Sequence, residues 1–594
     1  MLISLLREKI SYNKILYFLA FSVASVLTAL PVLVFNARGG YPSIEFFKWV
    51  LTFPIVAYGT GAAVFMFLAK RGDIRFTRIE LAWLAIVLIL AIQPLVLPVR
   101  SIHEWVRNAY FFAALGGAVF VLRNLPIDRA LPGILRFITV TGGVSTLFGF
   151  MQNLAPGVRF PFILDTTRLP GRFLGNTTLD NLLGVYLALA IIAGAWLLLN
   201  SAQAGKLTPI VKAFDFLLLV FNSAGMWKTG SRSAFLACLA GVAALLAFSR
   251  SRPGLLKKCV MAMAAIAALA ACVMFVAPGV LRVERKDMTR LFARDVLSTR
   301  YEGRYSIWLT TLEMIKTAPL FGVGLGNYKW NYLDALSVSR EVYTLRPRYT
   351  YWAHNEYLQW IAETGMIGGI LFFSLLIYCV GLGLRGIRSE TDEKKQCLVW
   401  SIAALAVLMV DSCFSRPLHH VETAFTTSLA LAVISRLKAA SVELPRKISL
   451  GVSGVMLLLS LSGVILFSQS FQGQAYLGKY FYSGLYIVGS PSEVREAYKK
   501  PFLLEDAYLQ LTARENYNMT LFGLGDAEKR QLDAIRLLAQ YFETQPRYAE
   551  LNRLMLLYQK RGDIEEARSY FKYYPPDERQ RFLEGRFTGR YMMR

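Results

Sequence analysis

Apolar stretches long enough to cross a membrane recur along the first 470 residues of the chain. A helix needs about 20 apolar residues to span a hydrocarbon core roughly 30 Å thick. About thirteen such stretches occur, with approximate bounds 15–35, 47–69, 79–98, 106–122, 131–151, 181–199, 208–226, 232–248, 259–277, 365–384, 397–414, 421–436 and 448–468. The pattern predicts an all-α polytopic membrane protein with about thirteen transmembrane helices.

Two longer polar segments depart from this pattern. Residues 279–364 form a large loop inside the predicted transmembrane domain, 1–469, and residues 470–594 form a tail rich in charged residues. In the tail, Ala534 and Leu538 recur about 33 residues later as Ala567 and Phe571. This spacing is typical of tetratricopeptide (TPR) helix pairs, and a generic helical bundle is the alternative. We therefore predict a separate, TPR-like helical domain over 470–594.

Basic residues set the orientation of the predicted spans. Lys and Arg number 65 against 40 Asp and Glu, which gives a formal net charge of +25. Basic residues cluster in five segments before or between the predicted spans, and the spans that separate these segments place all of them on the same side of the membrane. The segments are 7–14, 70–78, 250–258, 385–395 and 436–447. Short loops rich in Lys and Arg stay in the cytoplasm. The charge thus predicts a cytoplasmic N-terminus, with the loop and the tail outside, and it does not indicate a nucleic-acid partner.

Polar residues near the outer boundary offer a more specific chemistry. A single interfacial arginine can simply reach lipid phosphates. Several together, however, suit a lipid diphosphate, since the guanidinium group stays charged and matches phosphate oxygens. His354 is predicted to lie on the same, outer side of the membrane as these arginines, and a histidine with its ordinary pKa of about 6.5 can take a proton from a hydroxyl. Neither a DxD nor an HExxH sequence occurs, so we expect no metal site and no cofactor.

Several segments predicted to lie outside the membrane resemble those of the O-antigen ligase and polymerase superfamily of membrane glycosyltransferases. The segments that carry the resemblance are Thr229–Ser233, Gly303–Trp308, Pro319–Asn327, His354–Gln359 and Glu363–Gly365. The resemblance implies a GT-C-type fold in the bacterial inner membrane, with the active site on the periplasmic side beneath the large loop. It also implies a glycan donor linked to undecaprenyl diphosphate.

The resemblance also assigns roles to residues at matching positions. Arg232 and Arg304 match the essential arginines, which are expected to bind the donor diphosphate, and His354 matches the residue that activates the acceptor hydroxyl. A less sharply defined basic loop adds Arg168 and Arg172 as donor-binding candidates. The supporting candidates are Asn355, Arg300 and Asp411.

The resemblance leaves the acceptor open. The glycan could pass to lipid A–core (a ligase), to a growing polysaccharide (a polymerase), or to a Ser or Thr of a protein. The tail could bind a partner protein. From another class, a transporter or flippase of the same lipid-linked glycan would also suit many spans, although the candidate residues gather on one side of the membrane and form no line of charges through it.

Overall fold

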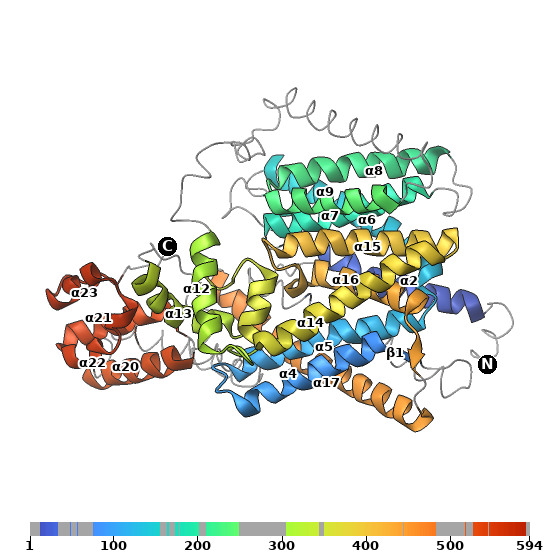
Figure 1. Ribbon diagram of the computed structural model, residues 1–594. Coiled ribbons are helices and arrows are strands. Elements are labelled where there is room, and N and C mark those ends of the chain that lie inside the picture. Colours follow the sequence, from blue (N-terminus) through green and yellow to red (C-terminus); the bar gives the residue numbers. More distant parts are fainter. Residues whose placement is uncertain are drawn as a thin grey trace. The chain divides into compact units, whose positions relative to one another are not determined.

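The computed structural model is almost entirely helical (Figure 1). It describes residues 12–33, 48, 56, 75–154, 163–164, 173–177, 179–200, 209–248, 304–343, 350–442, 445–482, 517, 527–544 and 546–589. The chain divides into two compact units. The first comprises Met1–Ala85, Phe111–Val296 and Phe372–Phe467, and the second comprises Ile86–Tyr110, Leu297–Leu371 and Ser468–Arg594.

Each unit is described by its own elements. The first contains α2 (Tyr12–Thr28), η1 (Leu30–Val32), β1 (Phe76–Thr77), α6 (Ile127–Leu154), α7 (Asp180–Leu199), α8 (Pro209–Lys228), α9 (Arg232–Phe248), α15 (Asp392–Ser412), η3 (Pro417–His419), α16 (Val421–Lys438) and β2 (Ser441–Val442). The second contains α12 (Arg304–Thr317), α13 (Tyr328–Tyr343), α20 (Ala527–Thr544), α21 (Tyr548–Arg561), α22 (Ile564–Arg568), η5 (Phe571–Tyr573) and α23 (Pro576–Leu583). Four helices contribute to both units: α4 (Arg78–Val96), α5 (Ile102–Asn124), α14 (Glu356–Ser389) and α17 (Arg446–Tyr482).

The described helices confirm a multi-pass membrane protein. Nine of them are long and apolar enough to cross a membrane, and each coincides with a predicted stretch. Helix α9 is also apolar but has 17 residues, and α16 covers the stretch 421–436 while carrying three charged residues. The stretches 47–69 and 259–277 lie outside the described residues. The total of about thirteen spans therefore stays a prediction.

Helix α7 lies at the centre of the first unit. Its sequence is apolar on every side, and 83% of the 18-residue stretch that would cross the membrane is buried within the protein. Helices α6, α8 and α9 pack against it, running side by side with α15 in Figure 1. Small residues permit this approach: a methyl group on Gly241 of α9 would collide with Ile192 of α7 and with Val407 of α15. Close backbone contact at glycine is a common way for helices to associate in a membrane.

An ion pair joins α6 and α8 inside the first unit. Arg136 Nη2 lies 3.0 Å from Asp215 Oδ2, and Arg136 Nε lies 3.2 Å from Asp215 Oδ1. The Asp215 side chain is 1% exposed, whereas that of Arg136 is 29% exposed. The two parallel hydrogen bonds satisfy a carboxylate that would otherwise be costly to bury.

We expect Asp215→Leu to destabilise the first unit by about 3 kcal/mol, because the substitution leaves Arg136 without its buried counter-charge. Thermal unfolding in detergent measures the effect. The double substitution Asp215→Leu with Arg136→Leu removes both charges and should recover most of the loss. A double variant as unstable as the sum of the two single variants would show that the pair does not act as a unit.

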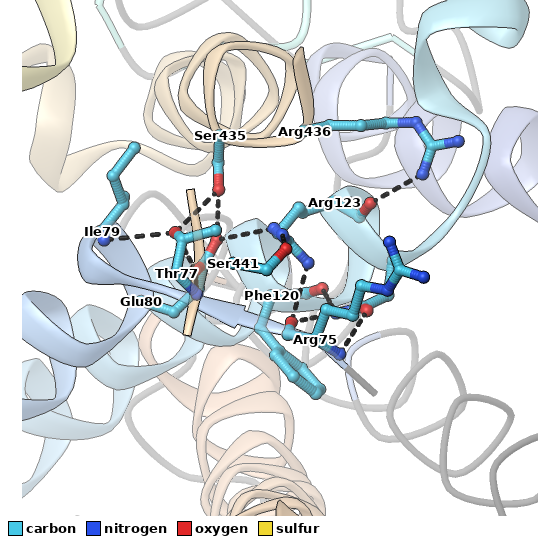
Figure 2. A network of polar contacts seen from close by, with 10 residues as sticks. Arg75, Thr77, Ile79, Glu80, Phe120, Arg123, Ser435, Arg436 and Ser441 are labelled. Atoms are coloured by element: carbon cyan, nitrogen blue, oxygen red, sulfur yellow. Dashed lines mark hydrogen bonds and ion pairs between the residues drawn. The ribbon is translucent and has the colours of Figure 1, made fainter. Parts of the chain in front are cut away.

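A polar network ties together the end of the first unit that the charge pattern predicts to be cytoplasmic (Figure 2). Glu80 accepts hydrogen bonds from the Thr77 amide at 2.6 Å and from the Ser435 hydroxyl at 2.6 Å. Arg123 donates to Arg75 O at 2.8 Å and to the Ser441 hydroxyl at 3.1 Å. The short strands β1 and β2 pair antiparallel beside it. Arg75, which belongs to a predicted cytoplasmic cluster of basic residues, and Arg123 therefore have structural partners here.

In the second unit, the described tail helices share one hydrophobic core with the helices of the large loop. Tyr328 and Tyr332 of α13 belong to the same buried cluster as Ala534 and Leu538 of α20. Helices α20 and α21 form a helical hairpin, and α21 ends at Gly562, whose φ of 78° is left-handed. The following α22 has only 5 residues. The TPR assignment and the domain boundary at 469/470 stay predictions.

Candidate active site

Arg232 opens α9 directly after a tight turn in the first unit. The turn uses Gly230 at φ 63°, and the Ser231 hydroxyl accepts the Ala234 amide at 3.3 Å as a helix cap. On α7, a side chain at Gly184 would collide with Thr229, Ser231 and Ala234, so this turn packs closely against the first turns of α7. The motif Thr229–Ser233 thus holds a half-buried arginine at a fixed helix end.

Asp411 lies fully buried near the C-terminal end of α15, at the same end of the first unit as Arg232. Helices α9 and α15 are antiparallel and touch at Gly241 and Val407. With a rise of 1.5 Å per residue, Asp411 is about 6 Å beyond that contact and Arg232 about 13.5 Å beyond it. The two residues are therefore offset by about 7.5 Å along the helices.

A buried pair that the sequence did not suggest lies at this end as well. Lys48 forms an ion pair with Glu422, and their side chains are 0% and 2% exposed. Lys48 Nζ also donates to Asn176 O at 2.9 Å. These contacts link the start of α16 to the segment 173–177, which immediately follows the predicted basic loop. Neither Lys48 nor Glu422 is among the candidate residues that the sequence predicts.

In the second unit, the motif Pro319–Asn327 is a loop that docks on a kink in α14. Gly322, Gly324 and Gly326 all have positive φ, a conformation that favours glycine. The kink is at Gly365, whose φ is 68°. Met366 N donates to Pro319 O at 2.8 Å, and a methyl group on Gly365 would collide with the Leu320 carbonyl.

Glu363 fastens the same loop from α14. Its carboxylate accepts the Gly326 amide at 2.8 Å and the Gln359 side-chain amide at 3.1 Å, and its carbonyl accepts the Gly324 amide at 3.0 Å. Two motifs that are far apart in the sequence thus form a single structural element. Gln359 and Glu363 support the start of α14 and the segment before it.

His354 lies at the entrance to α14 in a strained conformation. It is half-buried, and its φ of 50° is left-handed, which is uncommon for a residue with a side chain. Its neighbours are held on both sides: Ala353 N donates to Gln359 Oε1 at 3.2 Å, and Leu358 N donates to Asn355 Oδ1 at 3.0 Å. Asn355 therefore caps α14, which is a structural role for a residue predicted as supporting.

Arg304 is the first residue of α12, a helix that contacts the segment carrying His354. Trp308 Nε1 donates to Ala353 O at 3.1 Å, so α12 contacts the residue immediately before His354. Arg304 lies four residues before Trp308, and residues at this spacing share a helix face. Arg304 and His354 thus lie in the second unit, while Arg232 and Asp411 lie in the first. Arg168, Arg172 and Arg300 lie outside the described residues.

A family of known proteins matches the segment of the chain that contains Arg232, Arg304 and His354. Residues 216–373 match the O-antigen ligase family. The matched range contains Arg232, Arg304 and His354, and it confirms the superfamily that the motifs resemble. The roles of these residues stay predictions.

The chain is also similar to an individual protein, the exopolysaccharide production protein ExoQ of Rhizobium meliloti (strain 1021). The two chains are 27% identical over 297 residues. The similarity covers 48% of this chain and 62% of ExoQ, so less than two thirds of that relative is represented.

Gln93 of α4 is a further residue that supports the loop Pro319–Asn327 and its contact with Glu363. Its side-chain amide donates to Phe321 O at 2.7 Å and to Glu363 O at 2.9 Å. Its oxygen accepts Trp105 Nε1 and Leu325 N, both at 3.2 Å. The sequence does contain a signal for Gln93: it is a polar residue within an apolar stretch, and such a residue usually has a polar partner because burying it without one is costly.

We expect Gln93→Leu to destabilise the second unit by about 2–4 kcal/mol, since the Phe321 carbonyl loses its side-chain donor, the Glu363 carbonyl loses one of its donors, and two N–H groups lose their acceptor. Thermal unfolding measures the effect. Gln559→Leu is a matched control in the same unit because Gln559 donates one hydrogen bond, to Phe582 O at 3.0 Å. An equal loss in the two variants would contradict the assigned role of Gln93.

Proposed function

We propose that this protein is a glycosyltransferase of the inner membrane that moves a glycan from undecaprenyl diphosphate to an acceptor hydroxyl on the periplasmic side. The observation that carries the proposal is the match of residues 216–373 to the O-antigen ligase family. That segment contains Arg232 and Arg304, the two arginines predicted to be essential, and His354, the predicted base.

The position of Arg232 supports a role in binding an anion. A helix N-terminus carries a partial positive charge and N–H groups without intrahelical partners, so together with an arginine it favours the binding of an anion. Arg232 is the first residue of α9 and is fixed by the capped turn before it. In the proposed reaction it binds the donor diphosphate, and Arg304 binds the same group from α12.

The proposed reaction is a single substitution at the anomeric carbon. The acceptor oxygen forms a bond to that carbon while the bond from the carbon to the diphosphate oxygen breaks. His354 takes the proton of the acceptor hydroxyl, and the diphosphate leaves with the bonding electron pair. The arginines stabilise the negative charge that develops on the leaving group. Undecaprenyl diphosphate and a new glycosidic bond are the products.

Among the three acceptors, we favour a growing polysaccharide. The similarity to a protein of exopolysaccharide production supports chain extension over transfer to lipid A–core or to a protein. Membrane lipids would surround the spans, and the donor lipid would enter from the bilayer.

Reconstitution of the purified protein with an undecaprenyl-diphosphate oligosaccharide tests the proposal. Each acceptor is offered separately: a second molecule of the donor, lipid A–core, and a Ser- and Thr-containing protein. We expect a ladder of products on the carrier lipid. Transfer only to lipid A–core would identify a ligase, transfer only to the protein an O-oligosaccharyltransferase, and movement of the lipid without a new glycosidic bond would contradict a transferase.

A further inference from the structure

The tail is joined to the segment that carries His354 through a set of specific contacts within the second unit. Tyr573 of the tail donates its hydroxyl proton to Asp334 of α13 at 2.5 Å. Arg340 of α13 donates to Tyr573 O at 2.6 Å and to the Tyr548 hydroxyl at 2.7 Å. Burial, followed by the nearby Asp334 carboxylate, raises the pKa of Tyr573, so the phenol keeps the proton it donates. These bonds fix the start of α21 against α13.

Arg547, the residue directly before α21, extends these contacts toward His354. Its guanidinium carbon lies 4.6 Å from the ring centroid of Trp330 and 5.5 Å from that of Tyr351. Trp330 is 1% exposed, while Tyr351 is 40% exposed and lies three residues before His354. The guanidinium therefore bridges a buried ring of α13 and the segment that leads into His354.

Lys329 holds the next residue of this segment. Its Nζ lies 2.5 Å from Glu104 Oε1 of α5, 4.4 Å from the ring centroid of Trp330 and 5.8 Å from that of Trp352. Burial lowers the pKa of Lys329 to about 8 against the opposing effect of Glu104, so the amine is mostly charged at neutral pH. Trp330 thus lies between two cations, each of which also reaches a residue just before His354.

His354 needs such support because its backbone is strained. A left-handed φ in a residue other than glycine persists only where the surroundings fix it. Ala353 is held by Trp308 and Gln359, and the two residues before it are contacted by Lys329 and Arg547. Without the contact between Arg547 and Tyr351, the segment 351–354 would relax and the imidazole of His354 would move.

We propose that Arg547 is a positioning residue for His354, and that the tail thereby contributes to the transfer reaction. This inference rests on the proposed function. In this proposal the tail helps to hold the general base, His354, in place. The contact that does so is made by the guanidinium of Arg547 with Tyr351.

The test compares Arg547→Ala with Arg568→Ala in the reconstituted transfer assay. Arg568 is a matched control because it lies in the same tail, is 60% exposed and forms an ion pair with the exposed Glu565. We expect Arg547→Ala to lower kcat about 10- to 100-fold, as misplacement of a catalytic group by about 1 Å does, while the KM for the donor changes less than twofold. Arg547→Lys keeps the charge and should recover part of the rate.

Tyr351→Ala provides a second route to the same result. It removes the other partner of the bridge at an exposed position, so it carries the same prediction if Arg547→Ala does not fold. Rates are expressed per folded molecule, measured by circular dichroism and size-exclusion chromatography. A kcat per folded molecule equal to that of Arg568→Ala would overturn the positioning role. A wild-type protein that forms no glycosidic product would instead overturn the proposed function.

Discussion

Replacement of His354 by alanine is expected to lower glycan transfer by about 100- to 10,000-fold, the range typical for loss of a general base. The protein should remain folded, because the contacts that hold this segment are made by Ala353, Asn355 and Gln359 and not by the imidazole of His354 alone. The effect should fall on kcat, since the proton is transferred only in the chemical step.

His354→Asn separates base chemistry from backbone strain. Asparagine tolerates a positive φ better than most residues, so it should preserve the conformation at φ 50° while removing the base. We expect it to be as inactive as His354→Ala and at least as stable in thermal unfolding. Full activity in either variant would exclude His354 as the base, and activity in the asparagine variant alone would assign His354 a structural role.

Replacement of Arg232 by alanine should lower transfer by about 100- to 1,000-fold, as loss of one group that stabilises an oxyanion does. Arg232→Lys should recover only part of the rate, because lysine keeps the charge but cannot present two parallel N–H groups to phosphate oxygens. The variants should also bind the donor lipid more weakly, which can be measured by direct titration.

The turn before Arg232 provides a control for this prediction. Ser231→Ala removes the cap on α9 but keeps the guanidinium, so it should cost about 1 kcal/mol of stability and little activity. If Arg232→Ala retained wild-type affinity for the donor and wild-type kcat, the arginine would have only an interfacial role with membrane lipids.

The hydropathy pattern predicted the membrane helices well because the bilayer imposes a length and a composition on each of them. Stretches such as 181–199 and 397–414 coincide with α7 and α15 within a few residues. Even α16, with three charged residues, could be recognised from its apolar centre. Helix ends were less predictable: the stretch expected from 365 matches the part of α14 that follows the non-helical backbone at Gly365, whereas the helical part from Glu356 to the kink was not predicted.

Contacts between distant parts of the chain could not be read from the sequence. Nothing local links Lys48 to Glu422, and nothing local pairs Gln93 with the carbonyl of Phe321. The same holds for Arg547, which has the sequence context of an ordinary tail arginine. Motif residues were easier to find because they combine unusual residue types in a short span, although Glu363 and Asn355 prove to hold backbone groups in place.

The central claim is that this protein forms glycosidic bonds at the expense of a lipid diphosphate. The most direct measurement follows both products in one reconstituted reaction: new glycosidic bonds by mass spectrometry and released undecaprenyl diphosphate by chromatography. We predict that the two appear in equal amounts with the wild type, and that both fall together in His354→Asn and Arg232→Ala. Release of the lipid without bond formation, or equal yields in the wild type and both variants, would contradict the claim.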